Sequence, residues 1–377
     1  MPVFDNAKIV LADKVLKGHV VTEGGLITAI GEGRAGTGED LDGDLLIPGL
    51  VELHTDHLQT HIAPRPGVRW NTEAAIQAHD AQIAVSGITT VLDALPVGLD
   101  EDGGLTSKES RALADAITEA QDSGRLRAEH RFHLRCEVSN KNSEPGFDLF
   151  EDLENIALVS LMDHTPGQRQ FRSLEAYRRY FQRKSGMSDA VFEDFQAERR
   201  ASAARWSDGN RKALAARANA RGLVLASHDD ATAAHVAEAV RDGVRIAEFP
   251  TTPEAAQASR AAGMQVLMGG PNLVRGGSHS GNVSAGELAD RNMLDIVSSD
   301  YVPFSMLQGA FMLGERGGWS LPAAIATVSA NPAGAIGMTD RGTIATGLRA
   351  DLVRVNRAAP GAVPVVRSVW RGGVRIA

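Results

Sequence analysis

The central part of the sequence alternates between short apolar runs rich in β-branched residues and longer segments rich in Ala, Glu and Arg. Eight of the apolar runs have the length of a strand, and they cover residues 49–54, 89–95, 131–138, 157–163, 223–227, 246–249, 265–268 and 294–298. Helical patterns separate most of them, as over residues 106–123, 231–241, 253–262 and 285–292. Eight strands that alternate with helices predict a parallel sheet closed into a (β/α)8 barrel. An open doubly wound sheet is the alternative, but no GxGxxG turn follows the first strand, which weakens it.

The two ends of the chain differ from this centre. Both read as short strands separated by Gly turns, for example KIVLADKVLKGHVVTEGGLITAIG near the start and VRSVWRGGVRIA at the end. We therefore expect one small β-sandwich domain from residues 1–46 and 342–377, beside a catalytic barrel of residues 47–341. The connection over residues 165–222 is unusually long and has helical patterning over 174–183 and 189–221. We interpret it as a helical insertion that forms a lid or substrate wall, with an extra pair of packing helices as the alternative.

Composition and charge limit what such a barrel can bind. The 377 residues suffice for one large barrel with a small appendage, and a net charge of −8 argues against a general nucleic-acid or membrane-surface binder. A local basic pocket for an anionic substrate is compatible with that charge. The first residues lack a secretory pattern, no apolar run approaches the ~20 residues of a spanning helix, and the one cysteine, Cys136, excludes an internal disulfide. We therefore expect a cytoplasmic protein that acts on a small molecule, and a homo-oligomer is compatible with this expectation.

Residues 47–61, IPGLVELHTDHLQTH, join an apolar run to several side chains that commonly bind metals. If the run is a strand, the side chains of His54 and Asp56 lie on the same face at its carboxyl end. Active sites of (β/α)8 barrels form where the strands end, so the residues that follow the other runs are candidates as well. Such residues recur at five of the eight strand ends, and the candidate metal ligands are His54, Asp56, Glu137, His164, His228 and Asp300.

Imidazole and carboxylate together suit a divalent ion such as zinc, manganese or iron. Six ligands are too many for one open catalytic site, so we expect one or two ions, the pair sharing a bridging carboxylate. Taken alone, any one of these residues is more often a capping or hydrogen-bonding group, and Glu137 could instead form a salt bridge with Arg135 or another Arg nearby. Asp300 could be a ligand, a general base that accepts a proton from water, or both.

Polar loops after the fourth and seventh strands carry groups that bind anions. The guanidinium group of an Arg can donate two parallel hydrogen bonds to phosphate oxygens, and the pair Gly276 and Gly277 lets backbone N–H groups approach an anion closely. The candidate substrate-binding residues are Gln168, Arg169, Gln170, Asn272, Arg275, His279, Ser280 and Asn282. His57 and His61 could line the pocket or form loop hydrogen bonds, and His79, in a helical stretch, is interpreted as structural.

At these residues the chain resembles the amidohydrolase superfamily. Two phrases that are typical of it flank the barrel, PGLVELHTD at the opening strand and GTIATGLRADLV at the return to the small β domain. The chain is most similar to the family of α-D-ribose 1-methylphosphonate 5-triphosphate diphosphatases of the carbon–phosphorus lyase pathway. This resemblance covers nearly the whole chain, most strongly residues 47–351, and rests on ELHTDHLQTH, SGITTVLDAL, AEHRFHLRCE, LVSLMDHTPGQRQF, LASHDDATAAHVAE, AEFPTT, MGGPNLVRGGSHSGN and DIVSSDYVP.

The resemblance implies a metal-dependent phosphoanhydride hydrolase of phosphonate degradation, which releases pyrophosphate and leaves a 5-phosphate on the ribose. It also implies metal-ligand roles for His54, Asp56, His164, His228, Asp300 and, with weaker support, Glu137. Two features depart from the wider superfamily. Its common HxH opening is His54-Thr55-Asp56 here, and the strand-six region where other members place a His reads Ala247-Glu248-Phe249, so the standard ligand list does not transfer directly.

If the substrate is a phosphoanhydride, we expect water to attack the α-phosphorus, with Asp300 as the proton acceptor and the metal ions screening the phosphoryl charge. Two other functions stay open. One is a C–N hydrolase of the same superfamily, a deacetylase or cyclic-amide hydrolase, that acts on a phosphorylated substrate. The other is a non-enzymatic, metal-dependent scaffold in a phosphonate-processing assembly. The Arg and Gly-rich loops favour a polyanionic substrate over a neutral amide. The complete set of candidate ligands argues against a catalytically inactive site.

Overall fold

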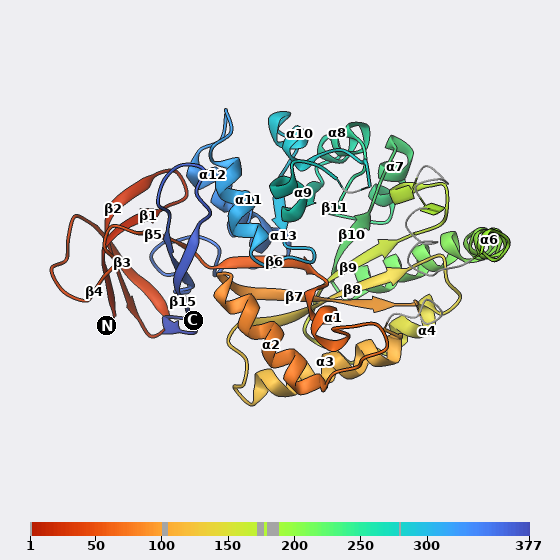
Figure 1. Ribbon diagram of the computed structural model, residues 1–377, viewed down its shortest axis with the longest axis horizontal. Helices are drawn as coiled ribbons and strands as arrows, with labels where there is room; N and C mark the ends of the chain where they lie inside the picture. Colours follow the sequence, from red (N-terminus) through yellow and green to blue (C-terminus); the bar gives the residue numbers. More distant parts are fainter. Residues whose placement is uncertain (1, 100–104, 172–176, 179–187, 279) are drawn as a thin grey trace.

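The computed structural model describes residues 2–99, 105–171, 177–178, 188–278 and 280–377. Its larger part is a sheet of eight parallel strands that neighbour one another in chain order: β6 Leu50–Thr55, β7 Ile88–Val97, β8 Glu129–Glu137, β9 Ile156–Met162, β10 Val224–His228, β11 Ile246–Glu248, β12 Gln265–Gly269 and β13 Ile296–Ser298. A parallel bridge between Thr55 and Asp300 brings the last strand back to the first, so the barrel nearly closes. The expected (β/α)8 architecture is confirmed (Figure 1), and every predicted run overlaps one of these strands.

Helices surround the barrel. They are α1 His57–Ile62, α2 Thr72–Val85, α3 Ser107–Asp122, α4 Ser143–Asp148, η1 Arg169–Phe171, α6 Asp189–Ala220, α7 Ala233–Arg241, α8 Pro253–Ala261, α9 Gly270–Arg275, α10 Ala285–Asp290, α11 Ser305–Leu313, α12 Leu321–Ala326 and α13 Ala330–Ala335. Many begin at a Ser, Thr or Asn whose side chain accepts the N–H three residues on, as Thr106 does for α3. At α3, Glu109 returns the contact to the Thr106 backbone, which completes a capping box.

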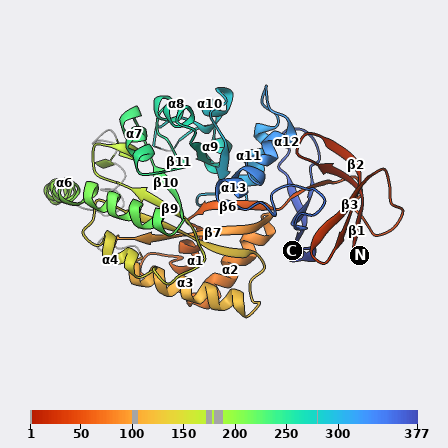
Figure 2. The same ribbon diagram turned by 180° about the vertical axis from the view of Figure 1, so that it is seen from behind.

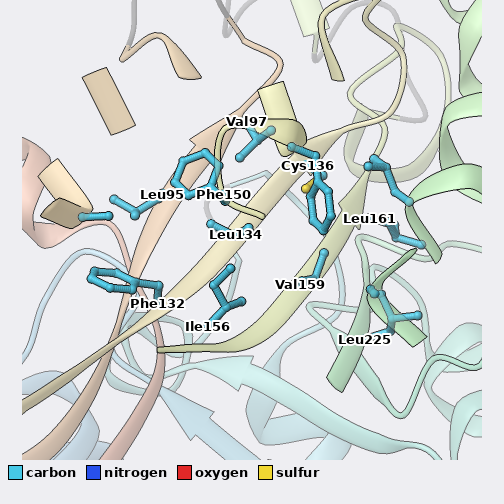
Figure 3. Close-up of a cluster of buried hydrophobic side chains, with 14 of the residues drawn as sticks. Leu95, Val97, Phe132, Leu134, Cys136, Phe150, Ile156, Val159, Leu161 and Leu225 are labelled. Carbon is cyan, nitrogen blue, oxygen red and sulfur yellow. The ribbon is translucent and has the colours of Figure 1, made fainter. Parts of the chain in front are cut away.

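The barrel strands are buried on both faces, which is why they appear in the sequence as continuous apolar runs. All ten residues of β7 are buried. On β8, Phe132, Leu134 and Cys136 belong to one apolar cluster outside the barrel, as Figure 3 shows. Successive side chains of a strand alternate in direction, so Arg135 and Glu137 point the other way, and both line the cavity at the mouth of the barrel.

A separate sheet contains strands from both ends of the chain. Its order is β16-β15-β14-β5-β1-β2-β3 with β4 beside β1, and the strands are β1 Val3–Val10, β2 Val15–Glu23, β3 Leu26–Glu32, β4 Glu39–Asp40, β5 Leu45–Pro48, β14 Leu352–Asn356, β15 Val365–Arg371 and β16 Val374–Arg375. The two ends meet where β14 pairs antiparallel with β5, and the rings of Phe4 and Trp370 pack edge to face at 4.7 Å. Both termini therefore lie at this sheet, beside the barrel (Figure 1). The proposed domain boundaries and the description as a sandwich stay predictions.

The long connection contains α6, a helix of 32 residues at the end of the molecule farthest from the terminal sheet (Figure 2). Asn210 on α6 donates to the carbonyl oxygens of Val138 and Asn140 at 2.9 and 2.7 Å, which fixes the helix against the loop after β8. The helix expected over residues 174–183 lies largely outside the described residues. None of the described helices is both long enough and apolar enough to span a membrane.

Candidate active site

A cavity of about 470 Å³ opens at the carboxyl ends of the barrel strands. It brings together most of the residues that the sequence predicts for the site, and those in its walls are His54, Asp56, Glu137, His164, Gln170, His228, Asn272, Arg275, Ser280, Asn282 and Asp300. Of the remaining predicted residues, Gln168 and Arg169 lie elsewhere, and His279 lies outside the described residues.

The first group of possible metal ligands consists of His54, Asp56 and Asp300, each of which offers one atom within 4.8 Å of the other two. The junction of the first and last barrel strands brings them together. The N–H of Asp56 donates to the carbonyl oxygen of Asp300 at 2.8 Å, and the N–H of Asp300 donates to the carbonyl oxygen of His54 at 3.0 Å. Residues almost 250 positions apart in the sequence therefore meet because the barrel closes at this point.

The second group consists of His164, His228 and Asp229, again with one atom from each within 4.8 Å. It adjoins the first group, because the ring of His228 stacks on that of His54 with centroids 5.7 Å apart. The predictions omitted Asp229. The sequence does carry a signal for it, because two acids follow His228 directly in the HDD phrase after the fifth strand.

Glu248 on β11 is fully buried and contacts one member of each of the two groups. Its two oxygens accept hydrogen bonds from Nδ1 of His54 at 3.1 Å and Nδ1 of His228 at 3.2 Å, which leaves Nε2 of each ring available to other partners. Burial would raise the pKa of Glu248, but the imidazoles of His133 and His54 outweigh it and hold the pKa well below its usual value. Burial would likewise lower the pKa of His54, yet the Glu248 carboxylate raises it above its usual value. This buried acid on β11 therefore orients two of the candidate ligands.

Glu137 plays a similar part for His164. One carboxylate oxygen accepts from the ring Nδ1 of His164 at 2.6 Å, and the other accepts from its backbone N–H at 3.1 Å. Among the described residues Glu137 belongs to neither of the two groups above. Glu137 therefore supports the candidate ligand His164. The alternative of a salt bridge between Glu137 and Arg135 is wrong, because Arg135 pairs with Asp56.

Arg135 is a site residue that the sequence predictions did not include. Its Nη1 donates to both carboxylate oxygens of Asp56, at 2.6 and 2.7 Å. Burial would raise the pKa of Asp56, but this guanidinium more than offsets it, and the pKa lies below its usual value. Arg135 lies inside β8 and not at its end, so the pattern of residues that follow the strands does not indicate it.

Asp300 differs from Asp56 in its electrostatics. Burial raises the pKa of Asp300, and the negative charge of Asp56 adds to the effect. Its backbone is left-handed, with φ of 56°, as are those of Asp229 and Phe249 after β10 and β11, at 57° and 51°. Non-glycine residues adopt this conformation at a cost, and such strain concentrates at functional sites. A buried carboxyl with a raised pKa has the properties of a general base.

The predicted anion-binding loops form the outer wall of the cavity. Asn272 and Arg275 come from α9, which ends at Gly276 in the left-handed conformation, φ 78°. Asn272 accepts the N–H of Ala285 at 2.9 Å, which fixes the loop that follows. The insertion also contributes, since Tyr177, which precedes α6, and Arg199 on α6 line the same cavity. Neither of these was predicted, and for Arg199 the reason is that the docking of a long helix cannot be deduced from its own pattern.

Gln168 and Arg169 require a correction. They line a second cavity, of about 640 Å³, and not the one that holds the His and Asp groups. Arg169 is buried and forms ion pairs with Asp230 and, at 3.0 Å, with Glu238. Its backbone is left-handed, with φ of 47°, and its side chain links the loop after β9 to Glu238 on α7 and to the carbonyl oxygen of His228, 3.5 Å away. From the loop after β9, His164 and Gln170 line the cavity with the His and Asp groups.

Comparison with known proteins agrees with this geometry. A model of the amidohydrolase family matches residues 68–377. The chain is 48% identical to the alpha-D-ribose 1-methylphosphonate 5-triphosphate diphosphatase of Escherichia coli, over 99% of this chain and 100% of that protein.

Solved structures support the fold. Dihydropyrimidinase from Brevibacillus agri superposes with a TM-score of 0.64 at 16% identity, over 99% of this chain and 94% of that one. N-acetyl-D-glucosamine-6-phosphate deacetylase from Mycobacterium smegmatis superposes with a TM-score of 0.65 at 15% identity, over 100% of both chains. The family match covers most of the chain and the identity to the Escherichia coli protein extends over nearly all of it, so the chain belongs to the amidohydrolase family.

Proposed function

We propose that this protein hydrolyses α-D-ribose 1-methylphosphonate 5-triphosphate to the 5-phosphate and pyrophosphate in phosphonate degradation, with one or two divalent cations. The observation that carries the proposal is one cavity whose walls contain two adjacent His/Asp groups and three arginines, Arg135, Arg199 and Arg275. Such a cavity suits a polyanion whose charge must be held and screened. The name of the Escherichia coli relative specifies the substrate.

The residues present fit divalent cations. Oδ2 of Asp229 is buried without a hydrogen-bond partner among the described residues, and it lies 3.4 Å from Nε2 of His228. An unpaired buried oxygen opposite an imidazole nitrogen is a costly arrangement that a cation would relieve. We assign one ion to His54, Asp56 and Asp300 and the other to His164, His228 and Asp229. The mixed nitrogen and oxygen donors favour zinc, manganese or iron.

When bound, such ions would lower the pKa of water and screen the phosphoryl charge. The chain's own residues supply the rest. Asp300, whose pKa burial raises, accepts the proton of the attacking water. Arg275 and Arg199 bind the phosphate oxygens at the outer wall, and Glu248 keeps the rings of His54 and His228 in place. There is little covalent chemistry for the protein in phosphoryl transfer, so positioning and charge account for the catalysis.

Phosphorus NMR of the ribose triphosphate phosphonate tests the proposal. The wild-type protein with added Zn²⁺ or Mn²⁺ should release pyrophosphate, and Asp300→Asn should release it at least a hundredfold more slowly while the protein stays folded. Release of single orthophosphates, or turnover of amides in place of the triphosphate, would contradict the proposed function. We place the reaction in the cytoplasm, which the single, reduced Cys136 supports.

A further inference from the structure

Three histidines outside the cavity lie close together, His57 and His61 on α1 and His79 on α2. Each offers one ring nitrogen, and the three nitrogens lie within 4.8 Å of one another. The two helices contact each other beside the barrel (Figure 1), and none of the three residues lines the cavity described above. We propose that His57, His61 and His79 form a separate binding site for a borderline transition-metal ion such as Zn²⁺, Cu²⁺ or Ni²⁺.

The spacing on α1 is the first argument. His57 and His61 are four residues apart, so a helix presents them on one face. Their Nε2 atoms are 3.1 Å apart. Two ligands about 2.05 Å from a tetrahedral zinc ion are separated by about 3.3 Å, so the pair already has nearly the required separation. The phrase HLQTH thus has the i, i+4 arrangement of paired histidine ligands.

His79 provides the second argument. It is fully buried, and its Nε2 lies 2.8 Å from Oδ1 of Asp93, whose other oxygen contacts His130 at 2.7 Å. The Nδ1 of His79 has no hydrogen-bond partner among the described residues. A carboxylate on one ring nitrogen with the other nitrogen left unpaired is the arrangement of a metal-binding histidine and its supporting acid.

The surroundings define the kind of ion. The three candidate ligands are imidazoles without a carboxylate among them, which suits zinc, copper or nickel and disfavours Mg²⁺ or Ca²⁺. His61 is only partly buried, so it offers both a route of entry and the freedom to close the group around an ion.

The alternative is a purely structural contact, in which Nε2 of His57 donates its proton to Oε1 of Gln82 at 2.8 Å and shares it with Nε2 of His61 at 3.1 Å. Zn²⁺ stoichiometry separates the two interpretations. The full-length protein, stripped with a chelator, is equilibrated with Zn²⁺, passed through a desalting column and analysed by mass spectrometry for metal per chain. The wild-type protein should retain one more equivalent of Zn²⁺ than His61→Gln, and His19→Gln, a change in the terminal sheet, should retain as many as the wild type.

Two further readouts keep the outcome interpretable. His61→Gln should keep the wild-type circular dichroism spectrum, and its kcat/KM should stay within about twofold, because His61 is not in the cavity. Equal stoichiometry in His61→Gln and the wild type would overturn the proposal. Loss of the equivalent together with loss of activity would also overturn it, since the ion would then belong to the catalytic groups. The Zn²⁺ count does not depend on whether the cavity hydrolyses a triphosphate.

Discussion

Nη1 of Arg135 donates to both carboxylate oxygens of Asp56, at 2.6 and 2.7 Å, so a fixed positive charge lies within the first group of candidate ligands. Arg135→Met should remove that charge and release Asp56, and we expect kcat/KM to fall about ten- to a hundredfold. This range corresponds to the roughly 1.5–3 kcal/mol that a hydrogen bond to a charged group contributes. Steady-state kinetics of pyrophosphate release checks it, with Arg131→Met on the same strand as the control. Equal kinetics in both variants would show that Arg135 only fills space.

The two oxygens of Glu248 contact His54 and His228, which belong to different groups. Glu248→Gln keeps the shape but loses the negative charge, so the pKa of His54 should fall and neither ring should be held as firmly. Loss of such a supporting contact typically weakens metal affinity about 10- to 100-fold. Competition with a fluorescent chelator measures the affinity, and Glu73→Gln on the exposed surface of α2 is the matched control. An unchanged Zn²⁺ affinity in Glu248→Gln would remove the orienting role.

The sequence predicted the barrel and most of its mouth for one physical reason. Parallel strands are buried on both faces, so they are visible as apolar runs, and the residue after each run lies at the mouth. This relationship predicts four of the site residues from the sequence, namely His54, His164, His228 and Asp300. For Glu248 the sequence shows only that the phrase Ala247-Glu248-Phe249 departs from the superfamily pattern. Its role depends on the positions of two rings that come from other strands.

The residues that were missed or misplaced share a different cause. Arg135 lies within a strand, and its importance follows from the direction of alternation on β8, which a pattern of apolar residues does not fix. Arg199 reaches the cavity because of the way α6 docks. Position in the loop after the fourth strand predicts Arg169 for the site, but its guanidinium pairs with Asp230 and Glu238. Local patterns thus locate strand ends, whereas the direction of loop side chains depends on backbone turns and tertiary contacts.

A second buried carboxylate joins the first and last barrel strands. The oxygens of Glu52 accept from the backbone N–H groups of His54 and Ser299 at 2.6 and 2.5 Å, and burial raises the pKa of Glu52 to about 7. Between about pH 4.5 and 7 the folded protein therefore holds a proton that the unfolded chain releases. Stability should fall as pH rises through this window, by on the order of 3 kcal/mol from this group.

Urea unfolding of the metal-free protein at pH 5, 6 and 7 measures this contribution as the difference between the wild type and Glu52→Gln. The difference in unfolding free energy should decline with pH, because Gln does not titrate. Glu73→Gln should follow the wild-type profile in parallel. A difference between wild type and Glu52→Gln that stays constant over this range would mean that Glu52 is ionised throughout.

Arg275 lies at the end of α9, beside two glycines, in the outer wall of the cavity. If it binds the β- or γ-phosphate, its contacts are lost on a substrate analogue that carries a single phosphate. Arg275→Ala should therefore raise KM for the triphosphate about 10- to 100-fold, the loss of a charged hydrogen bond, and change the Ki of the monophosphate analogue by less than about threefold. Arg275→Lys keeps the positive charge but not the bidentate guanidinium, so its KM for the triphosphate should lie between those of the wild type and Arg275→Ala. Equal weakening of both ligands by Arg275→Ala would place Arg275 at the ribose end of the cavity, or would show that it acts through the shape of the loop.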